Sequence, residues 1–468
     1  MDRLRKVVSN LGFLLQITGL LLILPIAIGL QNGEVQAVAS LVATCFLSFG
    51  VGFVFNSFCE RKELDENTSL WLMLFTFTIL PLVLMVPYVW NNVFSSGNPF
   101  DLFTNAYFET VSGFTTTGFS FITNAEMLPL SLLFYRSLVE FIGGVGFIYI
   151  LVAFLYPNYS LDVFAETFGV DKLSDNLKRV FLSVMAVYTL LVVVFTVIFY
   201  FVYRSNLVVA STAAIDVLTG GYQPNVTAGF GVFQISILVL MLLGSVNFSF
   251  HYNLFRLKWR SLLTAEIKLY LGVIVGATVL VAVLAWVNPF DSLFHVVSMM
   301  SSTGLDYINV GAASVVAKVV FILIGLVGGC AFSMAGGIRI QRVKVLVDAL
   351  RRKADRKVLR SVLASIVGFV VVLFVLSLVF STIGISLLDS VFEVGSALTT
   401  NGISMGKTTV DIPLGYKWLL ILAMIIGRIE ILVVFKAFKG LGIWGMAKRF
   451  VGGLRKRMRR RPSYTISS

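Results

Sequence analysis

About ten apolar stretches divide this chain, and they constrain its fold more than any other feature of the sequence. Each is close to the roughly 20 residues that an α-helix needs to cross the hydrocarbon core of a bilayer. Within a bilayer every backbone N–H and C=O group has to be paired inside the protein, so helices are the expected structure. The stretches lie at residues 10–30, 36–57, 69–92, 132–156, 180–203, 231–254, 266–288, 317–345, 360–385 and 418–438.

The composition is typical of a polytopic membrane protein rather than of a soluble domain. The mean hydropathy is +0.91, 57% of the residues are hydrophobic and only 13% are charged. The first apolar stretch is followed by a second one rather than by a small-residue cleavage site, so we expect a retained helix and not a signal peptide. The three cysteines, Cys45, Cys59 and Cys330, are far apart and have no metal-binding spacing.

The net charge of +13 is distributed unevenly along the chain. When the apolar stretches are followed in order, the clusters of Lys and Arg fall on the same side as the N-terminus, whereas the connections near 31–35, 93–104 and 121–131 contain none. This positive-inside pattern predicts a multi-pass protein of the cell (inner) membrane with both termini in the cytoplasm. We expect the basic tail to lie on anionic lipid rather than to bind nucleic acid.

On the opposite side, four polar stretches repeat one pattern. Three of them carry Phe at the fourth position and Ser at the eighth, and all end on a glycine that follows a hydroxyl residue by two positions. The glycines recur at intervals of about 80 to 100 residues, which indicates that span, short helix, polar loop and second span occur four times. The stretches are NAYFETVSGFTTTG (105–118), VVASTAAIDVLTGG (208–221), DSLFHVVSMMSSTG (291–304) and DSVFEVGSALTTNG (389–402).

Such stretches are unusual in a membrane protein, because non-helical backbone at membrane depth persists only where protein buries it or where it lines a water-filled path. Four short helices that converge on one axis could present carbonyl oxygens to a dehydrated cation. Glycine allows both the backbone angles and the close approach that this requires. Four amphipathic surface loops with turn glycines are the alternative. The predicted selectivity-filter residues, which would hold the ion, are Thr116, Thr117, Gly118, Thr219, Gly220, Gly221, Ser302, Thr303, Gly304, Thr400, Asn401 and Gly402.

The predicted fold is an all-α polytopic membrane protein. Four pseudo-repeats of span, re-entrant pore helix, filter loop and span surround one pore, and two extra helices precede them. The expected boundaries are 1–66 for the two N-terminal helices, 67–160, 161–260, 261–358 and 359–447 for the four pore repeats, and 448–468 for the basic cytoplasmic tail.

Several motifs suggest a family. They are SGFTTTG (112–118), FYRSLVEFIGGVGFIYI (134–150), TGGY (219–222), GGCAFSMAGGIRIQRVKVL (328–346) and KWLLILAMIIGRIE (417–430). Together they resemble the Trk/Ktr/HKT superfamily of potassium transporters, and its TrkH-like membrane subunits in particular. The two extra N-terminal spans fit the Trk branch. The resemblance implies potassium as the transported ion, since HKT proteins with serine at the first filter position tend to favour sodium and this chain has Gly118 there.

The resemblance also implies a gate below the filter. In the family an intramembrane loop breaks the second span of the third repeat, and residues 328–339 correspond to it here. Four glycines interrupt that apolar span at a cost of about 1 kcal/mol of helix stability each; close helix packing at small residues is the alternative. Arg428 corresponds to a pore arginine near the loop, with a structural salt bridge, for instance to Glu430, as the alternative. The glycines are Gly328, Gly329, Gly336 and Gly337.

Other charged residues have simpler expected roles. Arg136 and Glu140 stand at i and i+4, so they are expected to pair on their helix as scaffold for the first filter stretch. Eight carboxylates are expected near the outer mouth of the pore, where they would concentrate cations or cap helices. These are Asp101, Glu109, Asp216, Asp291, Asp306, Asp389, Glu393 and Asp411.

No enzyme motif is present in the sequence, so we predict a transporter and not an enzyme. The cytoplasmic connections near 157–179 and 340–360 are too short for a nucleotide-binding domain. The resemblance implies a homodimer, no covalent cofactor, and nucleotide control only through a cytosolic TrkA-like regulatory subunit, which we expect to press on residues 339–360.

Two other functions stay open. A sodium-permissive or ion-coupled (Na⁺ or H⁺) potassium symporter could use the same scaffold, because filter residues do not separate channel-like flux from coupling. A polytopic membrane enzyme or a non-conducting scaffold is the other possibility, and the lack of a catalytic cluster in the sequence disfavours it.

Overall fold

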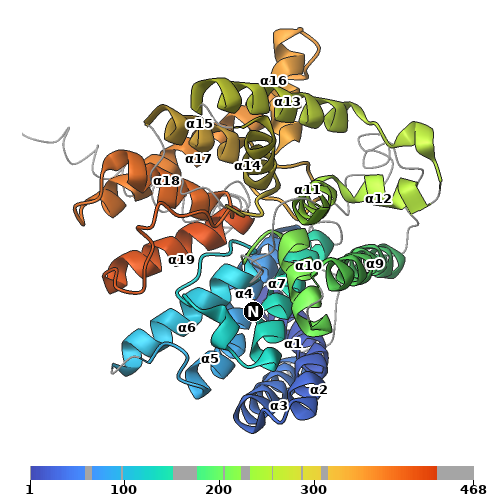
Figure 1. Ribbon diagram of the computed structural model, residues 1–468. Helices are drawn as coiled ribbons and strands as arrows, with labels where there is room; N and C mark the ends of the chain where they lie inside the picture. The colour runs from blue at the N-terminus through green and yellow to red at the C-terminus, as the bar shows by residue number, and fades with distance from the viewer. Residues whose placement is uncertain are drawn as a thin grey trace, which may run out of the picture.

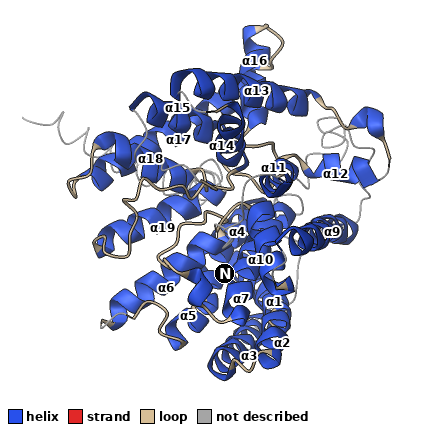
Figure 2. Ribbon diagram, in the orientation of Figure 1, coloured by secondary structure: helices blue, strands red, loops and turns tan. Residues whose placement is uncertain are grey.

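The computed structural model describes residues 2–57, 66–95, 98–150, 177–203, 206–222, 232–255, 257–285, 288–306 and 315–429. Within these ranges every regular element is a helix (Figure 2), which confirms the predicted all-α class for this part of the chain. Six of the described helices are long and apolar enough to cross a membrane, at Leu4–Gln31, Val35–Ser57, Thr68–Trp90, Ser183–Val202, Ala265–Leu284 and Arg356–Ser381. Shorter apolar helices lie at Leu207–Thr219, Phe233–Ser245 and Val315–Val327.

The first three helices form a hairpin whose two arms approach each other very closely. They are α1 (Asp2–Leu21), α2 (Ile23–Gln31) and α3 (Val35–Ser57). An ideal Cβ on Gly12 of α1 would lie 2.7 Å from the Gly52 carbonyl oxygen, and one on Gly52 of α3 would lie 2.6 Å from the Gly12 oxygen. Small residues allow this backbone contact, which supplies packing where lipid offers no hydrophobic driving force.

A carboxylate in the hairpin turn binds the start of a later helix. Glu34, in the turn between α2 and α3, accepts hydrogen bonds from Leu130 N (2.7 Å) and Ser131 N (2.9 Å). These N–H groups belong to the start of α7 (Leu130–Ile150), where the helix has no acceptors of its own. The negative charge also complements the positive end of the helix dipole.

Four short helices each start at a side-chain cap, which pairs an N–H group of the first turn. They are α6 (Pro99–Phe114), α10 (Leu207–Thr219), α14 (Pro289–Ser301) and α18 (Leu387–Leu398). The caps are Asn98, Asn206, Asn288 and Ser386, and their side chains accept from Phe100 N, Val208 N, Phe290 N and Asp389 N.

The remaining elements surround these short helices. Figure 1 shows α4–α7, α9–α11, α13–α15 and α17–α19 following one another in chain order around a centre, and contacts between α7 and α10, α11 and α14, α15 and α18, and α19 and α6 close the circle. The elements are α4 (Glu66–Leu84), α5 (Val86–Trp90), α9 (Leu177–Tyr203), α11 (Val232–Ser245), α12 (Phe248–Phe255), α13 (Ala265–Ala285), α15 (Val315–Val327), α16 (Ile340–Leu350), α17 (Arg356–Ser381) and α19 (Leu414–Ile429), with 3₁₀ turns at Ala125–Met127 and Trp259–Ser261.

The prediction of one continuous span over 231–254 is wrong. Helix α11 ends at Ser245 and α12 begins at Phe248. The Phe248 N–H donates to the carbonyl of Phe332 (3.1 Å), while the Asn247 side chain accepts from Ser249 N (2.7 Å). A distant loop and a side chain thus take the bonds that would continue the helix, and the helix breaks.

The apolar stretch 317–345 is interrupted where its glycines indicated. Helix α15 ends at Val327 and α16 begins at Ile340, so residues 328–339 form a loop. The ends of the stretches 132–156 and 418–438, and the basic tail 448–468, lie outside the described residues.

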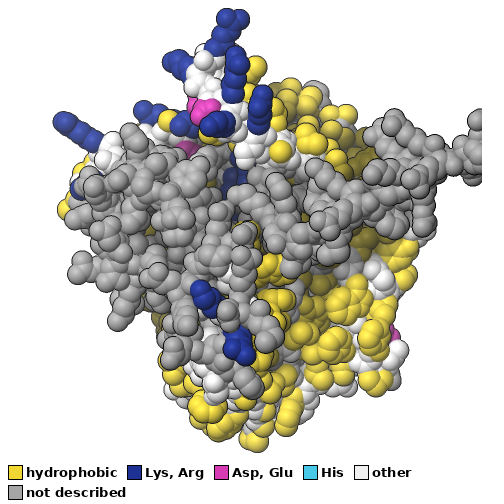
Figure 3. Space-filling view, turned by 180° about the vertical axis from the view of Figure 1, so that it is seen from behind, with side chains coloured by type: hydrophobic (Ala, Val, Ile, Leu, Met, Phe, Trp, Pro, Cys, Tyr) yellow, Lys and Arg dark blue, Asp and Glu magenta, His cyan; other side chains and the backbone are white. Residues whose placement is uncertain are grey.

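Basic side chains gather at one end of the molecule. Figure 3 shows Lys and Arg side chains at the top of the rear face, at the end where Figure 1 places α16. Exposed members lie in the turn that joins α16 to α17 and in the first turns of α17, namely Arg351, Arg352, Lys353, Arg356, Lys357 and Arg360. This surface belongs to the basic segment 339–360 picked out in the sequence.

The close contact of α1 with α3 can be tested with two glycines of one helix. Gly52→Ala should lower the apparent melting temperature in detergent, because overpacking costs about 1–3 kcal/mol. Gly50→Ala is the matched control, since Gly50 is exposed and has nothing within 4 Å of its ideal Cβ. Equal melting temperatures for the two variants would show that the contact does not hold the hairpin together.

Candidate functional site

The C-terminal ends of the four short helices lead into four tight backbone segments, here called the ring segments. They comprise residues 115–118, 219–222, 301–304 and 399–402. In three of them a hydroxyl residue and the glycine two positions later adopt the left-handed conformation, with φ of 55° and 83° at Thr116 and Gly118, 58° and 68° at Ser302 and Gly304, and 52° and 77° at Thr400 and Gly402. In a pleated strand successive residues face opposite sides. Left-handed residues at every second position break that pattern, so these segments are not strands.

The second ring segment is shifted by one residue from the predicted alignment. Gly220 is the left-handed residue here (φ 76°), so it takes the place of Thr116, and Tyr222 takes that of Gly118. The hydrogen bonds agree, because Gly221 N donates to Asp216 O as Thr117 N, Thr303 N and Asn401 N donate to Ser112 O, Ser298 O and Ser396 O. The alignment of Thr219 with the other filter hydroxyls is therefore wrong. The adjacent glycines Gly220 and Gly221 made either register possible in the sequence.

The four ring segments interlock into a closed ring. Each segment has a glycine whose ideal Cβ would fall on a carbonyl oxygen of the next segment, and the fourth segment returns to the first. The distances are 2.0 Å from Gly118 to Gly221 O, 2.6 Å from Gly220 to Ser302 O, 1.9 Å from Gly304 to Asn401 O and 1.9 Å from Gly402 to Thr117 O. No side chain fits at these positions, so the ring is built from backbone groups.

A glycine in a neighbouring helix lets each of three short helices end close to the ring. Ideal Cβ atoms on Gly143, Gly244 and Gly427 would lie 1.9, 2.3 and 2.2 Å from carbonyl oxygens in the last turns of α6, α10 and α18. In α14, the Met300 oxygen lies 3.4 Å from the ideal Cβ of Gly329. The negative ends of four helix dipoles therefore surround the ring, and this favours a cation at its centre.

Two buried carboxylates hold the chain where it leaves the ring. Glu109 accepts from Phe121 N (3.0 Å) and Ser120 Oγ (2.9 Å), and Glu393 accepts from Met405 N and Ser404 Oγ, both at 2.7 Å. Neither carboxylate is exposed, and Asp216 is only 4% exposed. The expectation that these three attract cations at the outer mouth is wrong, because their place in the fold is behind the ring.

Arg136 and Glu140 do not form the ion pair predicted within α7. Arg136 instead pairs with Glu109 of α6 at 3.1 Å, and its guanidinium carbon lies 3.4 Å from the centre of the Tyr222 ring. Glu140 accepts from Thr219 Oγ1 at 2.5 Å. The two residues flank the ring as predicted, but each connects a different pair of elements. Their partners are distant in the chain, so the i, i+4 spacing gave no sign of them.

The loop over residues 328–339 is fixed by backbone hydrogen bonds to elements around it. Cys330 N and Met334 N donate to Ser245 O (3.0 Å) and Gly244 O (3.1 Å) of α11. Ala331 N donates to Glu266 of α13 at 2.8 Å. Glu266 was not singled out in the sequence, and no motif surrounds it that could have revealed this contact.

The same loop touches the ring directly. Gly336 N donates to Ser302 Oγ (3.0 Å), and an ideal Cβ on Gly336 would lie 2.3 Å from Thr399 O. Arg428, which is 1% exposed, donates from Nη1 to Met334 O at 2.8 Å. The structure therefore brings together the glycines at 328, 329, 336 and 337, and it places Arg428 against the loop that they form.

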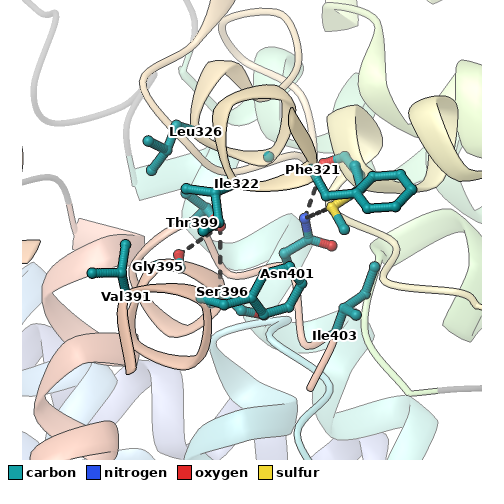
Figure 4. A pocket seen from close by; sticks show the side chains of 12 residues that line it. Phe321, Ile322, Leu326, Val391, Gly395, Ser396, Thr399, Asn401 and Ile403 are labelled. Carbon is teal, nitrogen blue, oxygen red and sulfur yellow. Dashed lines mark hydrogen bonds between the residues drawn. The ribbon is translucent and has the colours of Figure 1, made fainter. Parts of the chain in front are cut away.

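A small pocket lies behind the third and fourth ring segments, between α15 and α18 (Figure 4). The Asn401 side chain lines it and donates from Nδ2 to Met299 O at 3.1 Å. This predicted filter residue thus joins the fourth segment to the end of α14 through its side chain, while its carbonyl oxygen is the one that meets Gly304.

Comparison with known proteins places this geometry in a family. The family model named TrkH and described as cation transport protein matches residues 91–288 and 278–440. The chain is 26% identical over 462 residues to an "uncharacterized cation transporter" of Methanocaldococcus jannaschii, with 92% of this chain and 94% of that protein covered. It is 24% identical over 391 residues to the Trk system potassium uptake protein TrkH of Salmonella typhimurium, covering 76% and 77%. The crystal structure of the potassium transporter TrkH from Vibrio parahaemolyticus has the same fold, with a TM-score of 0.78 at 20% identity over 92% of this chain and 98% of that one.

The ring contacts predict unequal costs for two glycine substitutions. Gly402 and Gly406 are both left-handed, with φ of 77° and 76°, but only Gly402 meets a neighbouring backbone. Gly406→Ala should cost about 1 kcal/mol through backbone strain alone. Gly402→Ala should lower the melting temperature much further, because its Cβ collides with Thr117 O. Similar losses of thermal stability in the two variants would contradict the interlocked ring.

Proposed function

This chain belongs to the TrkH family of cation transport proteins, and on that premise we propose that it carries potassium into the cell through a channel-like pore. The observation that carries the proposal is the closed ring of four backbone segments at the ends of four converging helices. Its relatives include proteins named for potassium uptake. In this proposal the four pseudo-repeats have the boundaries predicted from the sequence, and potassium is the only ion or cofactor that the chain itself handles.

The ring segments would form the selectivity filter. Their carbonyl oxygens would replace the water around a dehydrated potassium ion, as the predicted filter residues require. Two features support this: side chains are excluded from the points where the segments meet, and the helix dipoles present partial negative charge. In the second segment the left-handed Gly220 would take the role that Thr116 has in the first.

Residues 328–337 and Arg428 would form the gate. The loop is buried against the ring, where it would block the path sterically. The guanidinium of Arg428 would add an electrostatic barrier to cations in a region of low dielectric constant. Opening would then require the loop to exchange its bonds to α11, α13 and Ser302 for others.

We further propose a homodimer in the inner membrane, with both termini in the cytoplasm and a cytosolic nucleotide-binding subunit on the basic surface of residues 339–360. The exposed arginines and lysines beside α16 support this surface, since they would complement an acidic partner. Co-purification of such a subunit with the parent, and its loss when the basic residues are replaced by glutamine, tests the proposal.

Flux measurements in proteoliposomes test the function itself. Potassium uptake with potassium as the only permeant cation is the expected result. Uptake of sodium at a comparable rate, or dependence of uptake on a Na⁺ or H⁺ gradient, would favour the sodium-permissive or coupled alternative. Absence of any cation flux in folded protein would favour the other alternative, a membrane enzyme or a non-conducting scaffold.

Selectivity should depend on Gly118. In Gly118→Ser the new side chain would meet the Gly221 carbonyl, whose oxygen lies 2.0 Å from the ideal Cβ position. We expect the ratio of potassium to sodium flux to fall about tenfold, equivalent to about 1.4 kcal/mol. Gly146→Ala, where the ideal Cβ has nothing within 4 Å, is the control. An unchanged flux ratio in the Gly118 variant would count against the filter.

Basal flux should rise when the barrier is removed. Arg428→Ala eliminates the buried guanidinium, and we expect about a tenfold increase, as for a barrier lowered by about 1.4 kcal/mol. Arg260→Ala removes a cation from an exposed position in the 3₁₀ turn Trp259–Ser261 and should leave the flux unchanged. Parent-level flux in folded Arg428→Ala protein would refute the gating role.

A further inference from the structure

The first and third ring segments contain a hydrogen bond that the second segment lacks the side chain to make. In the first segment the Thr115 and Thr117 hydroxyls are 2.8 Å apart, and in the third segment those of Ser301 and Thr303 are also 2.8 Å apart. The partner of Thr219 at the equivalent position is Gly221, which has no side chain. Without a substitute, the second segment would lose the bond that fixes its middle residue to the helix end.

A carboxylate from another helix occupies this place. An ideal Cβ on Gly221 would lie 2.1 Å from Glu140 Oε1, so the carboxylate of α7 stands where a side chain of the segment would begin. Thr219 Oγ1 donates to the same oxygen at 2.5 Å, which reproduces the bond seen in the first and third segments. Tyr222 N lies 3.4 Å from Oε2.

The surroundings hold Glu140 in that position. Its side chain is 0% exposed, and the buried carboxyl group of Asp216 on α10 lies near it. Asp216 stands at the helix position that Ser112, Ser298 and Ser396 occupy before the other segments, as the shared backbone bonds show. The second segment therefore differs from the others at two places, and both differences face Glu140.

From these contacts we infer that Glu140 is a specificity-determining positioning residue, whose carboxyl group replaces in space the side chain missing at Gly221 and fixes the second filter segment. The inference rests on the proposed function, because the property that it explains is selectivity for potassium. A segment held only by its backbone would have more freedom to adapt to a smaller cation, so selectivity would fall with the loss of Glu140.

A double-mutant cycle tests whether the Glu140 carboxyl group takes the place of the side chain that is missing at Gly221. Glu140→Ala should reduce the ratio of potassium to sodium flux about tenfold, or about 1.4 kcal/mol. Glu140→Gln keeps an acceptor for Thr219 and should stay within about twofold of the parent. Gly221→Thr alone should be destabilised by the collision with the carboxylate. The combined variant, Glu140→Ala with Gly221→Thr, should regain most of the selectivity, because the backbone at Gly221 is not left-handed and accepts a side chain.

Two controls make the result specific. Glu140→Ala combined with Gly146→Ala introduces a side chain into open space on the same helix, and it should regain nothing. The apparent melting temperatures of all variants give a second readout of the same double-mutant cycle, and this readout does not depend on ion flux. Parent-like selectivity in Glu140→Ala, or a combined variant no better than Glu140→Ala in both selectivity and melting temperature, would overturn the inference. Absence of potassium flux in the parent would refute the proposed function instead, while the stability cycle would still test the pair.

Discussion

The contact between each ring segment and the carbonyl oxygen of the next one determines how the rest of this protein is built. Because no side chain fits at these contacts, the positions of the segments depend largely on the groups behind them. The four short helices do this at one end, where glycines of neighbouring elements admit the last carbonyl groups of three of them. Carboxylates do it at the other end, where Glu109 and Glu393 bind the departing chain. The glycines and the buried charges are therefore two parts of one arrangement.

Three kinds of group position the four segments. Behind the first and fourth segments a carboxylate of the preceding short helix binds the backbone just after the ring. The third segment uses a hydroxyl, since Ser298 Oγ donates to Leu305 O at 2.7 Å. The second segment relies on Glu140 from α7. Polar groups at membrane depth are costly unless they are paired, so these bonds also explain why charges are tolerated there.

The sequence predicted what depends on local pattern and missed what depends on contact between distant residues. The long helices followed from apolar length, and the loop at 328–339 followed from its glycines. The break before Phe248 did not, because its cause is the carbonyl of Phe332 more than 80 residues away. The register of the second segment was ambiguous for a related reason. Two adjacent glycines fit either alignment, and the register shows only in the left-handed backbone of Gly220 and in the bond from Gly221 N to Asp216 O. The ion pair of Arg136 likewise has a partner on α6 that spacing along α7 cannot reveal.

The loop and the ring share atoms, which limits how a gate could work in the proposed pore. Ser302 belongs to the third ring segment, yet its hydroxyl also accepts from Gly336 N of the loop. The Thr399 carbonyl at the start of the fourth segment lies against Gly336, so the loop is packed on two segments at once. If the loop moves away, Ser302 Oγ loses the hydrogen bond from Gly336 N, and the Thr399 carbonyl loses its packing against Gly336. Opening would therefore change the support of the third and fourth segments, whereas the second segment, held by Glu140 on α7, would keep its own.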